Sequence, residues 1–223
     1  MENSEFINVE NYFYEMAVSL DENLRDKYQK QNIHEMLKRI LDILLSIIGL
    51  VIGIPIIIVF GLAIKLETPG PTIYAQERVG KNGKHFTIYK LRSMYSDAEK
   101  KGAKWAAKND PRITRIGSFI RKTRIDEIPQ LINILKGDMS IVGPRPERPH
   151  FTIKFNEENP QFINRLVVKP GLTGWAQING GYEMSPKEKW EADMYYIKNK
   201  NILLDILIIF KTIRVVLTGE GAR

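Results

Sequence analysis

The chain has 223 residues, enough for one ordinary domain with appendages, and its 43% hydrophobic content is sufficient for a packed core. It contains no cysteine, which excludes disulfides, thiolate catalysis and cysteine-ligated metal centres. The formal net charge is +7, and because residues 1–31 hold seven acids and three bases, the remainder carries +11. Such a basic body suits anionic lipid or phosphorylated substrates, and no nucleic-acid-binding motif accompanies it, so we expect no nucleic-acid partner.

A long apolar segment follows an acidic leader, which we assign to residues 1–36. From Ile43 to Ile64 no residue is charged, and these 22 positions are enough to cross a bilayer. Basic residues flank the segment on both sides: Lys38, Arg39 and Lys65. The positive-inside rule therefore gives no orientation. Gly53 and Pro55 near the middle predict a kink, and the residues alone leave two alternatives open, a kinked span and a re-entrant segment.

The region after the apolar segment predicts a β-hairpin. Residues 66–80 and 85–94 read as two extended runs around the turn-forming sequence GKNGK. Residues 96–109 are polar and predict an exposed helix that ends at Asp110-Pro111.

The last third of the chain holds a Gly- and Pro-rich run and an apolar tail. Residues 167–183, VVKPGLTGWAQINGGYE, predict an irregular loop. Trp175 in this loop offers a flat face on which a base could stack, although a core tryptophan is an equal alternative. The tail, residues 202–217, contains three charges, which favours an interfacial or packed helix over a span.

The most informative region is the stretch from Arg121 to Pro149, RKTRIDEIPQLINILKGDMSIVGPRPERP. It places two adjacent carboxylates, Asp126 and Glu127, among many bases and close to a Gly-Pro-Arg-Pro turn. An isolated Asp-Glu pair usually belongs to a solvated helix face. Here we expect the cations to lower a carboxylate pKa, so that one acid stays ionised and attacks a phosphate. Four arginines are candidates for binding the phosphate oxygens: Arg121, Arg124, Arg145 and Arg148.

The same stretch predicts an amphipathic helical region, because apolar residues recur at three- and four-residue spacing from Ile116 to Leu135. Pro129 is incompatible with one unbroken helix. If it begins a new helix, Asp126 and Glu127 lie at the N-terminal end, where backbone N–H groups favour anions. Consecutive helical residues point in different directions, so we expect the two acids to divide labour.

Several long motifs in one order make the chain resemble the bacterial sugar transferases, the monotopic phosphoglycosyl transferases. They are KRILD, QERVGKNGKHFTIYKLRSM, DPRITRIGSFIRKTRIDEIPQLINILKGDMSIVGPRPERP and KPGLTGWAQINGGYE, and the similarity runs from about Lys38 to Arg223. The resemblance implies transfer of a sugar 1-phosphate from a UDP-sugar to undecaprenyl phosphate with release of UMP. This would be the initiating step of exopolysaccharide, capsule or glycoconjugate biosynthesis.

The resemblance also implies roles for individual residues. Asp126 corresponds to the nucleophile, which forms a covalent aspartyl-phosphosugar, and Glu127 is the second member of the dyad. Magnesium is expected at Asp126 and Glu127. Arg121 and Arg145 match phosphate-binding arginines. The remaining candidates for substrate binding are Arg148, Asp138 and Trp175.

The implied architecture is an α+β, predominantly helical, monotopic membrane protein on the cytoplasmic face of the bacterial inner membrane. Residues 37–66 would form a re-entrant helix-break-helix in membrane lipid, and residues 67–223 a catalytic domain with a hairpin and an interfacial C-terminal helix. Two departures stand out, Ile54-Pro55 where some relatives have Ser-Pro and Gly181 where others have arginine.

Some questions stay open in the sequence. It fixes neither the sugar nor the oligomeric state, for which a homo-oligomer is one alternative. Two rival functions are a lipid-binding adaptor without catalysis and a magnesium-dependent pyrophosphatase that cleaves nucleotide sugars.

Overall fold

The computed structural model describes residues 15, 32–100, 102, 110–181 and 184–218, so most of the predicted acidic leader lies outside the described residues. The structure is predominantly helical, with two small two-stranded sheets in its described part, which confirms the predicted fold class. The longer elements are α3 (Asn32–Glu67), β1 (Ile73–Val79), β2 (His85–Leu91), α4 (Arg115–Lys122), α5 (Gln130–Lys136), α6 (Pro149–Glu158), α8 (Pro186–Asn199) and α9 (Ile202–Thr218). The shorter ones are η1 (Lys81–Gly83), η2 (Ile125–Glu127), β3 (Ser140–Val142), η3 (Phe162–Val167), β4 (Gly171–Thr173) and α7 (Trp175–Asn179), where η denotes a 3-10 helix.

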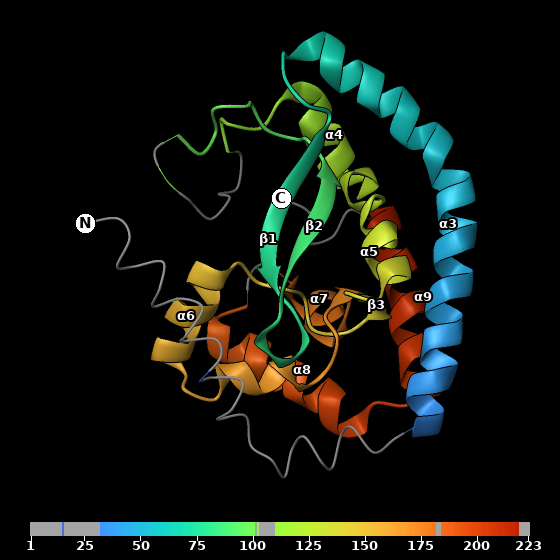
Figure 1. Cartoon of the computed structure of the whole chain (residues 1–223), viewed down its shortest axis with the longest axis vertical. Coiled ribbons are helices and arrows are strands. Elements are labelled where there is room, and N and C mark those ends of the chain that lie inside the picture. The colour runs from blue at the N-terminus through green and yellow to red at the C-terminus, as the bar shows by residue number, and fades with distance from the viewer. Residues whose placement is uncertain (1–14, 16–31, 101, 103–109, 182–183, 219–223) are drawn as a thin grey trace.

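The apolar segment forms one helix, α3, of 36 residues. It is long and apolar enough to cross a membrane by length and composition, and only 11% of its most apolar stretch is buried. We expected two helices separated by a break. The helix is instead continuous through Pro55, and Figure 1 shows that it bends partway along. A proline removes one backbone hydrogen bond, which is enough to bend a helix without ending it.

Both ends of α3 are fastened to the same body. Near its N-terminus, Lys38 Nζ lies 2.9 Å from Asp205 Oδ2 of α9. At its C-terminus, the Glu67 carboxylate accepts a hydrogen bond of 2.8 Å from the Arg115 backbone N–H, at the start of α4. A straight helix of this length would measure roughly 54 Å, so the two attachments are far apart along α3.

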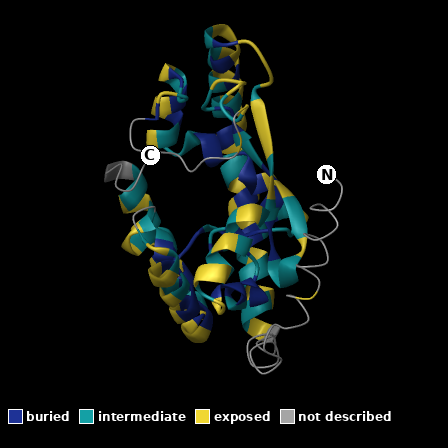
Figure 2. Ribbon diagram, turned by 90° about the vertical axis from the view of Figure 1, so that its left-hand side faces the viewer, coloured by how far each residue is buried: buried dark blue, intermediate teal, exposed yellow. Residues whose placement is uncertain are grey.

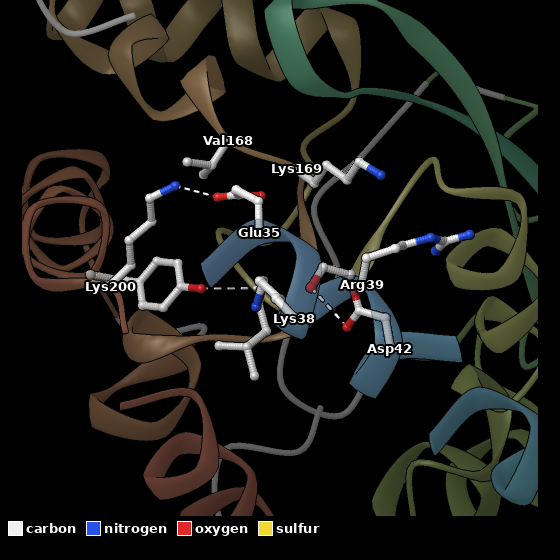
Figure 3. Close-up of a pocket in the computed structure, with 10 residues that line it drawn as sticks. Glu35, Lys38, Arg39, Asp42, Val168, Lys169 and Lys200 are labelled. Atoms are coloured by element: carbon white, nitrogen blue, oxygen red, sulfur yellow. Dashed lines mark hydrogen bonds and ion pairs between the residues drawn. The ribbon is translucent and has the colours of Figure 1, made fainter. Parts of the chain in front are cut away.

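The N-terminal attachment surrounds a pocket of about 30 Å³, a volume sufficient for one or two waters. Figure 3 shows its charged lining, in which Lys200 pairs with Glu35. Asp42 accepts hydrogen bonds from the Ser140 hydroxyl at 3.0 Å and from the backbone N–H of the following residue at 2.8 Å. The pairs join α3 to β3 and to the segment between α8 and α9, so we interpret this pocket as a structural attachment.

The predicted hairpin is confirmed. Strands β1 and β2 pair antiparallel in a register that places Tyr74 opposite Lys90, and the GKNGK turn contains positive φ angles at Asn82 and Gly83. Side chains alternate between the two faces of a strand. The residues on one face, which include Tyr74 and Lys90, line the large cavity described below. The first residues of β1 are exposed, as Figure 2 shows.

The predicted amphipathic region is two helices with a turn between them. Helix α4 begins after Thr114, whose hydroxyl accepts a hydrogen bond from the Gly117 backbone N–H, as a helix N-cap does. It ends at Lys122, and Pro129 is the N-cap of α5. The carboxylate pair lies in the short 3-10 turn η2 before α5, and not in the first turn of α5 itself.

The predicted irregular loop is wrong for most of residues 167–181. This run forms β4, which pairs parallel with β3, and the short helix α7. A side chain at Gly171 or at Gly174 would collide with the backbone of Gly143. The glycines therefore permit close approach of two backbone segments, which sequence composition alone cannot distinguish from a loop.

The tail forms α9, as predicted, and packs on the body through the buried Ile208 while Leu203 and Phe210 are exposed. The largest core cluster lies between η3, α8 and α9. The helix predicted for residues 96–109 is not present in its described part, which forms turns from residue 96 to residue 100. Residues 101 and 103–109 lie outside the described residues.

Candidate active site

The carboxylate pair is held in a strained turn between two helices. Arg124, directly before η2, has φ 58° and ψ 14°, a left-handed conformation that is uncommon for a residue with a side chain. Asp126 and Glu127 follow it and are only 7% and 8% exposed. Backbone strain of this kind often accompanies functional sites, because the surrounding structure must be rigid enough to maintain it.

Of the two acids, Glu127 is the one that forms ion pairs with neighbouring cations. Its Oε1 lies 3.2 Å from Lys90 Nζ of β2, and it forms a short ion pair with Arg145. Arg124 lies 3.9 Å away. Burial alone would raise the pKa of Glu127, but these three cations outweigh burial and hold the pKa well below its usual range. Glu127 is therefore the carboxylate that stays ionised.

Asp126 has the opposite electrostatic environment. Within the described part of the chain, no hydrogen bond or ion pair joins its carboxylate to another residue. Burial, reinforced by the charge of Glu127, raises the pKa of Asp126 to about 6, although Lys90, Arg121 and Arg124 act in the other direction. The predicted lowering of the attacking carboxylate's pKa is therefore wrong for Asp126, because the closest cations bind its neighbour.

Both acids line a cavity of about 630 Å³. Its polar part is formed by the dyad together with Lys90, Arg121, Arg124, Arg145 and Arg148. Its apolar part is formed largely by α9 and the β4–α7 region: Leu172, Ile178, Ile209, Ile213 and Val216. The cavity can therefore hold phosphate groups beside hydrocarbon.

Hydrogen bonds from distant elements fix the loop that carries Arg145. Arg78 Nη1 donates to the Pro146 carbonyl at 3.0 Å, and Arg165 Nη2 donates to the Arg145 carbonyl at 2.8 Å. The Val79 backbone N–H donates to the Glu147 carbonyl at 3.0 Å. With its backbone held in this way, the loop directs the Arg145 guanidinium at Glu127.

Two buried ion pairs support this loop, and sequence reasoning missed both of them. Arg165 lies 2.7 Å from Asp193, with each side chain 2% exposed. Lys189 lies 2.7 Å from Glu147. Burial raises the pKa of Glu147, but Lys189, Arg165 and Arg78 outweigh burial and lower the pKa to about 2. The partners are far apart in sequence, so no local pattern could have revealed them.

The predicted phosphate arginines are brought together, with one difference. Arg121, Arg124, Arg145 and Arg148 all line the cavity. Arg148, however, pairs with Glu99 at 2.7 Å, so a phosphate would compete with that carboxylate. Lys90 was missed, because a lysine in a strand gives no sign of which face it occupies until the register is known.

Two predicted substrate-binding residues are not in the cavity lining. Trp175 stacks on Tyr195 with ring centroids 4.9 Å apart, and Lys211 lies 5.4 Å from its ring, so it packs against the core. Asp138 follows α5, where its backbone N–H donates to the Asn133 carbonyl. Trp175 is half-buried and lies at the edge of the core cluster, so its role in substrate binding stays a prediction.

Helix α7 and the residues directly after it contribute other residues to the cavity. Gln177 lines it, and its buried Oε1 has no hydrogen-bond partner in the described structure. Gly181 also lines it, with φ 58°, a conformation that an arginine would adopt only with strain. Polar recognition from this segment would therefore come from Gln177.

The two acids of the dyad differ in how well they suit magnesium. No group of three or more His, Cys, Asp or Glu side chains suited to a metal occurs among the described residues. Mg²⁺ typically binds through one or two carboxylates, with substrate phosphates and water completing its shell. The unpaired oxygens of Asp126 suit this arrangement, whereas the Glu127 oxygens already contact Arg145 and Lys90.

The protein has a mostly helical body, an apolar surface helix and a cavity lined by buried carboxylates and by arginines. These features define a class of protein suited to phosphoryl chemistry beside lipid. Residues 33–219 match the family described as bacterial sugar transferase. This chain belongs to that family.

Several curated relatives are similar to this chain. The UDP-N-acetylgalactosamine-undecaprenyl-phosphate N-acetylgalactosaminephosphotransferase of Aeromonas hydrophila is 47% identical over 207 residues, which cover 92% of this chain and 49% of the relative. A putative undecaprenyl-phosphate N-acetylgalactosaminyl 1-phosphate transferase of Bacillus subtilis is 56% identical, over 68% of this chain and 90% of the relative. The UDP-glucose:undecaprenyl-phosphate glucose-1-phosphate transferase of Escherichia coli is 43% identical, over 81% of this chain and 40% of the relative. The chain thus spans about half or less of the Aeromonas and Escherichia proteins.

Proposed function

We propose that this chain transfers a sugar 1-phosphate from a UDP-sugar to undecaprenyl phosphate and releases UMP. One observation carries the proposal: a buried carboxylate, Asp126, has no described bonding partner, while cations surround its neighbour Glu127 in a cavity with an apolar side. The names of the relatives, which are undecaprenyl-phosphate sugar phosphotransferases, support the same reaction.

In the donor half-reaction, an Asp126 carboxylate oxygen attacks the phosphorus that bears the sugar. A new oxygen–phosphorus bond forms, the bond from that phosphorus to the bridging oxygen breaks, and UMP leaves with the electron pair. The product on the protein is an aspartyl-phosphosugar. Arg121, Arg145 and Lys90 line the cavity beside the dyad, where they offset negative charge on the transferred group.

In the acceptor half-reaction, a phosphate oxygen of undecaprenyl phosphate attacks the same phosphorus. The bond to the Asp126 oxygen breaks, the carboxylate is regenerated, and the lipid carries the sugar through a diphosphate. The apolar side of the cavity, formed by residues of α9 and by Leu172, suits the adjoining part of the prenyl chain.

Magnesium is part of the proposal. Asp126 would hold it together with phosphate oxygens, and Glu127, predicted as a second ligand, would contribute only if its contact with Arg145 loosened. When bound, the ion supplies positive charge to the transferred group. The residues of the chain orient the phosphate and keep Asp126 out of bulk water.

The proposed membrane topology is re-entrant, on the cytoplasmic face of the bacterial inner membrane. A helix that crossed a bilayer of about 30 Å would deliver its ends to opposite sides. Here both ends of α3 bond to residues 67–223, the proposed catalytic domain, through Lys38 and Glu67. This arrangement favours a helix that dips into lipid and returns. Whether copies associate into a homo-oligomer stays a prediction.

The test is UMP release by the purified chain in a membrane mimetic with magnesium and undecaprenyl phosphate, across a panel of UDP-sugars. The proposal expects release with at least one sugar, and multiple turnovers only when the lipid acceptor is present. No release with any sugar would contradict it and favour a lipid-binding adaptor. Sustained release without acceptor would contradict it in favour of a pyrophosphatase.

A further inference from the structure

Small residues of α3 face helix α5 and the segment just before it. Gly49 and Gly53 are four residues apart, so they lie on one side of α3, and the elements α3 and α5 pack directly on each other. A Gly-x-x-x-Gly pair in an apolar helix lets another backbone approach closely. In this chain the two glycines allow close packing within one molecule, against the segment that contains Asp126 and Glu127.

The contact at Gly53 is the tighter of the two. A Cβ placed on Gly53 would lie 2.5 Å from Ile128 Cγ2, and one on Gly49 would lie 2.8 Å from Leu131 Cδ1. Leu131 Cδ1 is the end of a flexible side chain and can rotate away. Ile128 Cγ2 is attached directly to Cβ, so it cannot move without the backbone or the whole side chain. Gly53 is also buried, although its neighbours Ile52 and Ile54 are exposed.

Ile128 connects this contact to the dyad. It follows Glu127 directly, and its backbone N–H donates to the Ile125 carbonyl at 3.2 Å, which closes the dyad turn. Its own carbonyl accepts from the Leu131 backbone N–H at 3.1 Å, which begins α5. A displacement of Ile128 therefore moves the turn that contains Asp126 and Glu127.

We propose that Gly53 is a positioning residue: the bend region of the membrane helix seats Ile128 and so sets the position of the Asp126-Glu127 turn. This inference rests on the proposed function, because it concerns the placement of its nucleophile. A side chain at Gly53 displaces Ile128, and with it the dyad relative to Lys90 and Arg145. The insertion of α3 in lipid and the geometry of the reacting carboxylate are then linked through the contact of Gly53 with Ile128.

The decisive experiment is a double-mutant cycle in the full chain. Gly53→Ala adds the Cβ that meets Ile128 Cγ2, and Ile128→Leu removes that branch methyl. We expect Gly53→Ala to lower kcat for UMP release by about tenfold in the parent background, an effect of the size that small misplacements cause, with little change in KM for the UDP-sugar. In the Ile128→Leu background, Gly53→Ala should lower kcat by less than about twofold, because the colliding methyl is absent.

Controls separate positioning from folding. Val51→Ile adds one carbon on the exposed side of α3 and should leave kcat, membrane association and Tm at parental values. Gly53→Ala should also keep its membrane association and lose only a small part of its Tm, because the better helix propensity of alanine offsets much of the cost of displacing Ile128. Parental turnover of Gly53→Ala, an equal loss in both backgrounds, or a fall in Tm that matches the lost activity would each overturn the inference. Absence of UMP release by the parent would instead contradict the proposed function.

Discussion

Arg145 forms an ion pair with Glu127, and no cation lies at bonding distance from the adjacent Asp126 among the described residues. This relationship gives two neighbouring carboxylates opposite electrostatic properties. The pKa of Glu127 is held low by its cations, while burial and the charge of Glu127 raise the pKa of Asp126 to about 6. Carboxylate pairs whose environments separate their pKa values commonly have different roles in catalysis.

Replacement of Arg145 should affect turnover strongly. In Arg145→Met, Glu127 loses its closest guanidinium and the cavity loses a donor for the transferred phosphate. We expect kcat/KM for UMP release to fall by roughly 100-fold, as when a single charge-stabilising donor is removed. Arg115→Met on the exposed side of α4 is the matched control and should retain parental activity. An Arg145→Met variant within about twofold of the parent would contradict this role.

The pH dependence of the donor half-reaction should report Asp126. Attack requires the ionised carboxylate, and because its pKa is raised to about 6, protons occupy it increasingly below that pH. We expect kcat/KM to decline with one acid limb near pH 6, about tenfold per pH unit. Higher magnesium should move the limb to lower pH, since a bound cation favours the charged form. A rate that stays constant down to pH 4 at low magnesium would argue against Asp126 as the reacting group.

Glu147 should make the fold sensitive to acid. Its folded-state pKa of about 2 lies below the ordinary value of 4.5, so its ion pairs stabilise the protein fully above pH 4.5. That contribution is lost as the pH falls from 4.5 towards 2, and it is on the order of 3 kcal/mol. In Glu147→Gln, Tm should be lower at neutral pH and should change less between pH 5 and pH 3. The exposed Glu191→Gln is the control, and a parental acid profile in Glu147→Gln would refute the assignment.

The buried pair of Arg165 and Asp193 should behave as a unit. Asp193→Asn leaves a buried guanidinium without its counter-charge, which typically costs about 3–5 kcal/mol of unfolding free energy. Removing both charges in Arg165→Met with Asp193→Leu should cost less stability than the single change, although the hydrogen bond to the Arg145 carbonyl is lost. Denaturant unfolding of Arg165→Met, of Asp193→Leu and of the double variant measures this coupling. Additive effects would mean that the pair is not coupled.

The sequence predicted features whose signal is local. The hairpin followed from two alternating runs around GKNGK, and the helical region around the dyad followed from apolar spacing and Pro129. The dyad itself was visible because Asp126 and Glu127 are adjacent. The helical structure of the tail and of the apolar segment was likewise predictable from the apolar composition of each run.

Features that depend on tertiary contacts were not predictable from the sequence. The pKa of Asp126 depends on the ion pair that Arg145 forms with Glu127 instead. The position of Arg145 depends in turn on hydrogen bonds from Arg78 and Arg165 to the loop that carries it. Trp175 was assigned to the substrate although Tyr195, on another helix, stacks on it. In the same way, Pro55 gives no sequence signal that distinguishes a bent helix from a broken one.

The covalent intermediate on Asp126 is the central claim, and intact-mass spectrometry of the full chain tests it most directly. The protein is incubated with magnesium and the accepted UDP-sugar, without lipid acceptor, beside Asp126→Asn and the control Glu191→Gln at an exposed acid. The account predicts a mass increase of one phosphosugar in the parent and in Glu191→Gln, no increase in Asp126→Asn, and loss of the adduct when undecaprenyl phosphate is added. UMP released at the parental rate by Asp126→Asn, or an adduct of the same size on that variant, would contradict it.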